Sequence, residues 1–170
     1  MRENDKKCLT LVFFVIEWFS VGNAVSLDIE QMNTRGREAV SMYYSIAIDG
    51  PAGAGKSTIA KEIAKKIHFI YVDTGAMYRA MALHLLRQGI VPGEEAQMDA
   101  ACENAEISIV YENGAQQVLL NGENVTGDLR REEVGNMASV SSARPRIREK
   151  LVELQRVLAS QTDVVMDGRD

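Results

Sequence analysis

Residues 46–58, with the sequence IAIDGPAGAGKST, decide the fold of this chain. Positions 50–57 satisfy the pattern G-x-x-x-x-G-K-[ST] in full. The apolar run 45–48 leads into it, and a helical pattern with an apolar stripe at positions 59, 60, 63, 64 and 67 follows it. We therefore expect a buried parallel strand, a glycine loop and an amphipathic helix in direct succession.

Each residue type in this loop has a chemical reason. Gly50, Gly53 and Gly55 allow backbone conformations that a side chain would block, so that their N–H groups can point into one concavity at the start of a helix. Lys56 can reach the β- and γ-phosphates of a nucleotide, and the Ser57 hydroxyl can bind Mg²⁺. A chance glycine-rich turn is the alternative, and the strand and helix in register disfavour it. The predicted phosphate-binding residues are Gly50, Pro51, Ala52, Gly53, Ala54, Gly55, Lys56, Ser57 and Thr58.

A second strand and helix follow the first pair. The apolar run 69–72 ends in the sequence DTG, and residues 76–88 read as a helix closed by Gly89. Arg79 falls in the first turn of that expected helix, where a cation opposes the helix dipole, so we expect an anion beside it. A solvated surface arginine is the alternative. His84 is expected to be partly buried and receives no role.

Residues 90–128 interrupt this alternation of strand and helix. We expect a short helix over 94–104 and two strands, 107–111 and 118–120, that are joined through Asn113-Gly114. Asn121-Gly122 marks a second turn. The pattern predicts an antiparallel insert in a parallel-sheet protein, and such inserts often select substrates.

The last part of the chain, residues 129–170, is rich in arginine. An apolar stripe at 147, 151, 154 and 158 predicts a helix, so Arg131 and Arg156 are assigned to solvated faces. The run 164–167 predicts a strand that ends in Asp167, a carboxylate that could hold Mg²⁺ through water. The sequence GRD follows at 168–170.

Composition narrows the class of protein. The chain has 170 residues and a net charge of −5, which argues against a surface that coats nucleic acid or membrane. Its two cysteines cannot form a disulfide framework or a cysteine-rich zinc site. We expect a cytoplasmic monomer with no nucleic-acid or membrane partner.

The first 41 residues differ from the rest. Residues 9–25 are largely apolar, but Glu17 interrupts them, and no clear signal-peptide cleavage site follows. We interpret 1–41 as an atypical extension from a start codon placed too early, with translation beginning at Met42. N-terminal sequencing of the native protein tests this prediction, and a mature chain that begins at Met1 would contradict it.

Three motifs together resemble one family. IAIDGPAGAGKST at 46–58, DTGAMYR at 73–79 and DGRD at 167–170 resemble the bacterial cytidylate (CMP/dCMP) kinases. The resemblance implies transfer of the γ-phosphoryl group of ATP to CMP or dCMP with Mg²⁺. Catalysis would then involve Lys56, Arg79 and Arg169, of which the two arginines would clamp the CMP phosphate. The resemblance also assigns the cytosine ring to Ser139, Arg148 and Asp170, and the shaping of the pocket to Thr74, Gly75 and Tyr78.

The resemblance also fixes the expected fold. We expect an α/β P-loop NTPase fold in which helices flank a parallel sheet and residues 90–128 form the monophosphate-binding insert. The kinase domain would span 42–170. Three parallel strands are expected, at 45–48, 69–72 and 163–166, and the core would be incomplete at the C-terminus because the family continues beyond DGRD.

Two other functions stay open. A nucleotide-binding chain without turnover would use the same phosphate loop, and so would another P-loop small-molecule kinase, such as a shikimate or nucleoside kinase. Assays with CMP, dCMP, UMP, AMP and shikimate separate these alternatives.

Overall fold

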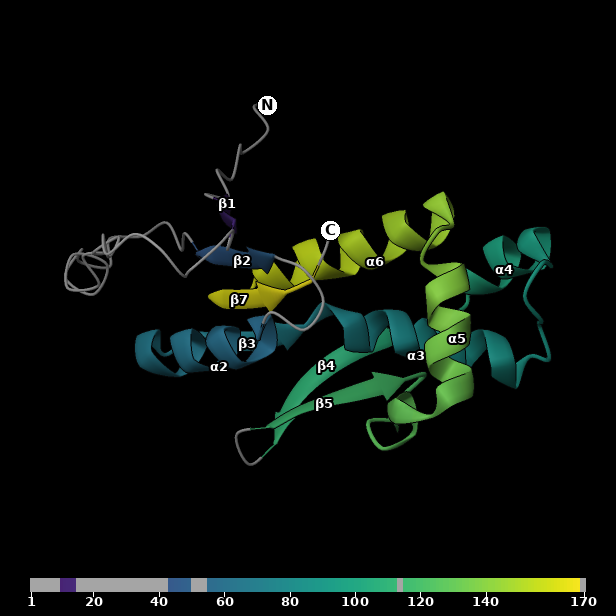
Figure 1. The fold of residues 1–170 in the computed structure, drawn as a ribbon, viewed down its shortest axis with the longest axis horizontal. Coiled ribbons are helices and arrows are strands. Elements are labelled where there is room, and N and C mark those ends of the chain that lie inside the picture. Colours follow the sequence, from purple (N-terminus) through teal and green to yellow (C-terminus); the bar gives the residue numbers. More distant parts are fainter. Residues whose placement is uncertain (1–9, 15–42, 50–54, 113–114, 169–170) are drawn as a thin grey trace, which may run out of the picture. The chain divides into compact units, whose positions relative to one another are not determined.

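The computed structural model describes residues 10–14, 43–49, 55–112 and 115–168 (Figure 1). These residues divide into two compact units. The first unit contains the described residues up to Tyr71 together with those from Ala159 onward, and the second contains 72–158. Each unit is described by itself.

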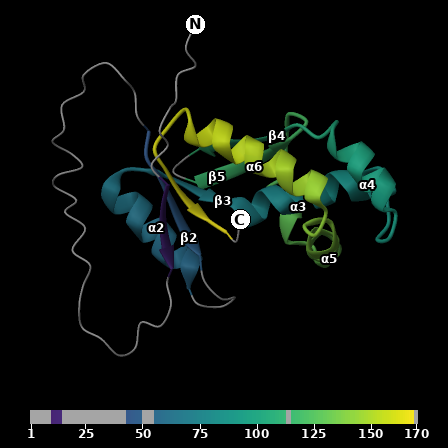
Figure 2. The same cartoon turned by 90° about the horizontal axis from the view of Figure 1, so that it is seen from above.

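The first unit is built on a parallel sheet. Its strand order is β1 (Thr10–Phe14), β2 (Ser45–Asp49), β7 (Val164–Asp167) and β3 (Ile70–Asp73), of which β3 crosses the boundary between the units. Strand β2 pairs in parallel with β1 on one side and with β7 on the other, and β1 and β2 lie side by side in Figure 2. The register places Ile48 opposite Asp167.

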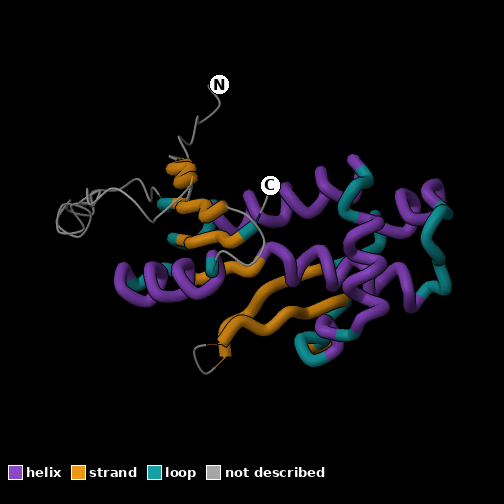
Figure 3. The backbone as a smooth tube through the Cα atoms, in the orientation of Figure 1, coloured by secondary structure: helices purple, strands orange, loops and turns teal. Residues whose placement is uncertain are grey.

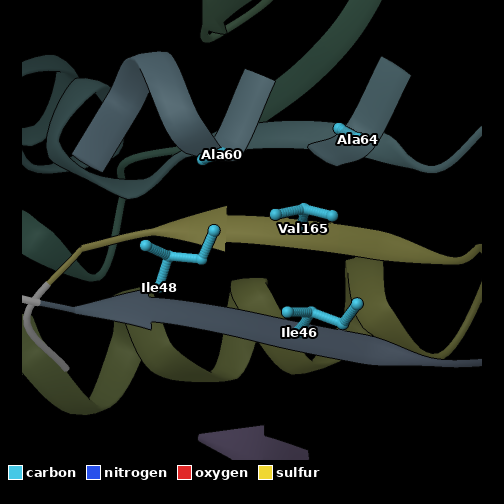
Figure 4. Packing of buried hydrophobic residues seen from close by; sticks show 5 residues of the cluster. All are labelled: Ile46, Ile48, Ala60, Ala64 and Val165. Carbon is cyan, nitrogen blue, oxygen red and sulfur yellow. The ribbon is translucent and has the colours of Figure 1, made fainter. Parts of the chain in front are cut away.

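Helix α2 (Lys56–Ile67) covers one face of this sheet. Ala60 and Ala64 face the sheet side chains Ile46, Ile48 and Val165, and all five are buried (Figure 4). Two small residues one turn apart let the helix approach the sheet closely, and the β-branched residues of the strands fill the space between. The apolar pattern that predicts helix and strand is therefore the pattern that forms this core.

The second unit combines helix α3 with an antiparallel sheet. Helix α3 (Thr74–Arg87) packs along β4 (Ile107–Glu112) and β5 (Ala115–Leu120) (Figure 1). Strand β6 (Glu123–Asn124) continues the sheet beyond β5. Asn121 and Gly122 join β5 to β6 with φ of 51° and 82°. Two successive positive φ values favour the Asn-Gly pair found there.

Three further helices and a single 3₁₀ turn complete the described part of the second unit. Helix α4 (Glu95–Cys102) contacts α3, the 3₁₀ turn η1 (Asp128–Arg130) leads into α5 (Glu132–Ser141), and α5 packs on α3. Helix α6 (Pro145–Ala159) follows after a three-residue turn, and all but its last residue belong to this unit. Figure 3 shows how much of this unit is helical.

The predicted α/β class is confirmed, with three corrections. We predicted three strands for the parallel sheet, and the structure has four. The additional strand is β1, which lies within residues 1–41, the segment that we interpreted as an atypical extension. Helix α3 begins at Thr74 instead of at 76, because the Asp73 side chain caps it by accepting a hydrogen bond from the Ala76 N–H (3.0 Å). Helix α5 and the 3₁₀ turn were not predicted. Among the described residues, no helix has the length and apolar character that a membrane span requires.

Candidate active site

The start of α2 has a backbone geometry that is compatible with the predicted phosphate-binding loop. Gly55 has φ 78° and ψ 15°, a left-handed conformation that glycine adopts without strain. Its carbonyl oxygen accepts hydrogen bonds from the N–H groups of Thr58 (3.0 Å) and Ile59 (3.1 Å), so the helix begins directly after it. The positive end of the helix dipole therefore lies at Lys56 and Ser57, and no acidic residue in the first turn compensates it.

The side chains at this helix start are accessible. Ser57 and Thr58 are exposed, and Lys56 is partly exposed. Gly50, Pro51, Ala52, Gly53 and Ala54 lie outside the described residues, so their predicted role as a phosphate loop stays a prediction. The described part of the motif places a cation and two hydroxyls at a helix N-terminus, as binding of a phosphate with Mg²⁺ would require.

Asp167 ends β7 in the same unit. Its side chain is buried, with 6% of the residue exposed, and its Oδ2 accepts a hydrogen bond from the Tyr71 hydroxyl at 3.3 Å. Because Asp167 pairs in register with Ile48, it lies beside the point where the chain leaves β2 for the loop. The Gly168 N–H donates to the Ile48 carbonyl oxygen (3.4 Å) and ties the two strand ends together.

Tyr71 is a residue that sequence reasoning missed at this site. Its hydroxyl contacts Asp167, and the Lys61 ammonium lies over its ring at 5.2 Å from the centroid. The ring is therefore held from the α2 side while its hydroxyl orients the carboxylate. A tyrosine next to Val72 on the strand before DTG was the only available sequence signal, and it read as one more apolar strand residue.

Arg79 lies in the second unit, on the exposed side of α3. Since α3 begins at Thr74, Arg79 is in its second turn, and the prediction that it lies in the first turn was wrong. The argument from an unfavourable dipole is weaker there. The guanidinium donates to the Leu129 carbonyl oxygen through Nη1 at 3.3 Å, which anchors it beside η1.

The junction between β3 and α3 holds the other DTG residues. Thr74 is buried at 4% exposed, and Tyr78 is also buried. A Cβ on Gly75 would lie 3.2 Å from Asp73 Oδ1, the atom that caps the helix. The Asp73 N–H donates to Gln116 Oε1 at 2.8 Å, so the insert braces this junction.

Ser139 and Arg148 lie on neighbouring helices of the second unit. Ser139 is exposed on α5, and its hydroxyl donates to the Gly135 carbonyl oxygen at 3.1 Å. Arg148 is exposed in the first turn of α6. Their remaining predicted partners, Arg169 and Asp170, lie outside the described residues.

Ion pairs organise the second unit. Arg144 pairs with Asp99 and with Glu95, both on α4. The hydrogen bond from Arg144 lowers the pKa of the Asp99 carboxyl. Arg87 forms a two-pronged pair with Glu123 (2.7 and 2.9 Å), and its hydrogen bond lowers the pKa of Glu123. These partners are 36–49 residues apart in the sequence, and no local pattern predicts them.

His84 is more buried than predicted, at 5% exposed. Burial lowers the pKa of its imidazole, against the opposing effect of its contact with the Ala101 carbonyl oxygen (3.2 Å from Nε2). It links α3 to α4, and we assign it to the packing of these helices.

The strand, the left-handed glycine and the helix that begins with Lys-Ser define the P-loop NTPase class. A model of the cytidylate kinase family matches residues 46–170. The chain is 50% identical over 126 residues to the cytidylate kinase of Caldicellulosiruptor saccharolyticus and 51% identical over 125 residues to that of Desulfitobacterium hafniense. It is 44% identical over 126 residues to the cytidylate kinase of Halalkalibacterium halodurans.

This chain belongs to the cytidylate kinase family. Each of the three alignments covers 74% of this chain and 53–57% of the relative. The chain therefore spans little more than half the length of these relatives.

Proposed function

We propose that this chain functions as an ATP-dependent kinase. It would transfer the γ-phosphoryl group to CMP or dCMP and release ADP together with CDP or dCDP. The observation that carries the proposal is the family match over 46–170, because this range includes all the proposed site residues. The first unit would bind ATP at the start of α2, and most of the residues proposed for the acceptor belong to the second unit.

Phosphoryl transfer needs positioning and neutralisation of charge instead of a covalent nucleophile. Lys56 would place its ammonium on the β- and γ-phosphates, while the N–H groups at the start of α2 bind their oxygens. Arg79 and Arg169 would hold the acceptor phosphate, for which the planar guanidinium group is suited. Ser139, Arg148 and Asp170 would recognise the cytosine ring, and Thr74, Gly75 and Tyr78 would shape its pocket.

The chain offers suitable donors for Mg²⁺. This ion binds oxygen and commonly uses one or two protein ligands together with substrate phosphates and water. The Ser57 hydroxyl and, through water, the Asp167 carboxylate are such donors, and the Tyr71 hydroxyl orients the latter. The described ranges contain no cluster of three or more His, Cys, Asp or Glu that could hold a metal ion. Bound there, Mg²⁺ would neutralise negative charge on the nucleotide phosphates.

The monomeric state, the absence of nucleic-acid and membrane partners and a cytoplasmic location are part of the proposal. They rest on the acidic composition and on the small, charged substrates. The domain limits, 1–41 and 42–170, also stay predictions.

Release of ADP by the 170-residue chain tests the proposal. We expect release to depend on CMP or dCMP and to be much slower with UMP, AMP or shikimate. A preference for shikimate would replace the proposal with another small-molecule kinase. Nucleotide binding without turnover under any of these conditions would replace it with a binding function.

A further inference from the structure

Three cations at the start of α6 contact α4 and the residue that follows it. Arg144 pairs with Asp99 and Glu95, Arg146 pairs with Glu103 through Nε (2.5 Å), and Lys150 donates to the Glu103 carbonyl oxygen (2.6 Å). Of the three, Arg144 has the most extensive contact. Its Nε and Nη2 both bond to the Asp99 carboxylate, at 3.2 and 2.5 Å.

Arg144 is also less exposed than Arg146. Its side chain is 24% exposed and that of Asp99 is 32% exposed, against 57% and 49% for Arg146 and Glu103. A two-pronged arginine–carboxylate pair fixes orientation as well as distance, because the planar fork and the carboxylate must be aligned. This pair is therefore suited to setting the angle between two elements.

Arg144 lies between the two helices, α5 and α6, that carry the proposed base-recognition residues Ser139 and Arg148. We define the α5–α6 corner as residues 139–148, with Ser139 at one end and Arg148 at the other. Arg144 lies inside this corner: its N–H donates to the Ser141 carbonyl oxygen (3.0 Å), and its carbonyl oxygen accepts from the Arg148 N–H (3.1 Å). A shift of Arg144 would therefore move the end of α5 and the start of α6 together.

We propose that Arg144, through its pair with Asp99, is a positioning residue that holds the α5–α6 corner against α4 in the geometry that accepts the nucleotide base. This inference rests on the proposed function, because it concerns the positioning of the residues that the proposed function assigns to base recognition. It assigns α4, which carries none of the proposed site residues, a role in the affinity for the acceptor.

The experiment compares Arg144→Gln, Asp99→Asn and the double variant with the wild-type chain. Binding of CMP and of ATP is measured separately by calorimetry, and hydrogen exchange is followed by mass spectrometry. We expect each single variant to weaken CMP binding about fivefold. We expect the double variant to be no weaker than the singles, because either substitution already removes the same contact.

Three observations separate positioning from a general loss of structure. ATP binding should stay within twofold of wild type. The melting temperature should change little, because partly exposed ion pairs contribute little to stability. Amide exchange should accelerate over 139–148 and stay unchanged over α2. Arg144→Lys should recover only part of the CMP affinity, since an ammonium cannot form the two-pronged pair.

Arg156→Gln is the matched control. Arg156 lies on the same helix and carries the same charge, but its side chain is 74% exposed and its ion pair, with Glu153, is at 3.7 Å within α6. CMP binding should be unchanged in this variant. If Arg156→Gln weakened CMP binding as much as Arg144→Gln, the loss of one positive charge would explain both results, and the inference would be overturned.

The outcomes distinguish this inference from the proposed function. If wild type binds CMP and the Arg144 and Asp99 variants bind it equally well, the inference is wrong and the proposed function stands. If wild type binds ATP but not CMP, the proposed function fails. Hydrogen exchange over 139–148 then tests whether the Arg144–Asp99 pair holds the α5–α6 corner. Faster exchange in Arg144→Gln supports this role, and unchanged exchange contradicts it.

Discussion

The first and second units differ in which atoms carry the proposed chemistry. In the first, backbone geometry at Gly55 and the start of α2 forms the proposed phosphate-binding turn, and Lys56 and Ser57 are adjacent in sequence. In the second, the proposed acceptor residues Arg79, Ser139 and Arg148 come from three helices. A site made by one turn is encoded locally, whereas a site made by several helices depends on long-range contacts.

The largest effect should come from the locally encoded site. We predict that Lys56→Ala lowers turnover on the order of a thousandfold, because it removes the cation proposed for the transferred phosphate. ADP release with CMP checks this. Lys66→Ala, on the last turn of the same helix, is the control and should keep wild-type turnover. Comparable turnover in Lys56→Ala and wild type would remove Lys56 from its proposed role.

The core of the first unit offers the next test. Ile48 is buried at 2% exposed against Ala60 and Val165, so Ile48→Ala should cost about 2–5 kcal/mol of unfolding free energy. Urea denaturation measures this value. Ile59→Ala makes the same change at a position on α2 that is 36% exposed, and it should have little effect. Equal losses in the two variants would contradict the packing of α2 on the sheet.

Substitution of a residue proposed to bind the acceptor should change the KM for CMP, whereas Lys56→Ala should change turnover. We predict that Arg79→Ala raises the KM for CMP roughly 10- to 100-fold, the cost of losing a charged hydrogen bond, while the KM for ATP stays within about twofold. Steady-state kinetics with each substrate varied in turn checks this split. Arg131→Ala, which removes an exposed arginine of the same unit, should leave both parameters unchanged. A rise of the same size for both substrates would break the division of roles between the units.

The smallest effect concerns pH. The pKa of His84 is lowered in the folded state, so the unfolded chain binds a proton at higher pH than the folded chain. Stability is therefore full above the unfolded pKa of about 6.5 and falls as the pH drops through the lowered folded value. Melting temperatures at pH 7.5 and 5.5 should show this fall.

His84→Gln should reduce the dependence on pH. His68→Asn is the control, because His68 is exposed at the end of α2 with a left-handed φ of 59° that asparagine tolerates. If the melting temperature of His84→Gln fell between pH 7.5 and 5.5 as much as that of wild type, groups other than His84 would cause the pH dependence.

The difference between the units also explains what the sequence could predict. Residues 45–67 follow apolar periodicity and a glycine pattern, and both the strand and the helix formed as predicted. Asn121-Gly122 marked its turn because two positive φ values suit this residue pair. In each case the cause lies within a few residues of the effect.

The features that the sequence did not predict depend on residues far apart in the chain or have a composition that is untypical of the structure they form. Helix α5 contains Gly135, Asn136 and Val140, which are weak helix formers, although its buried side chains at 134, 137, 138 and 141 have helical spacing. Strand β1 was not predicted because residues 1–41 were interpreted as an atypical extension, and an apolar run does not reveal its partner strand. The Arg144–Asp99 pair joins residues 45 positions apart, and only the folded chain brings them together.

Transfer of label from [γ-³²P]ATP to CMP tests the central proposal most directly. The wild-type chain and the Lys56→Ala variant are incubated with labelled ATP, Mg²⁺ and CMP, and the products are separated. Our account predicts labelled CDP from the wild-type chain and almost none from Lys56→Ala. Labelled inorganic phosphate in place of CDP, formed at the same rate with and without CMP, would contradict it.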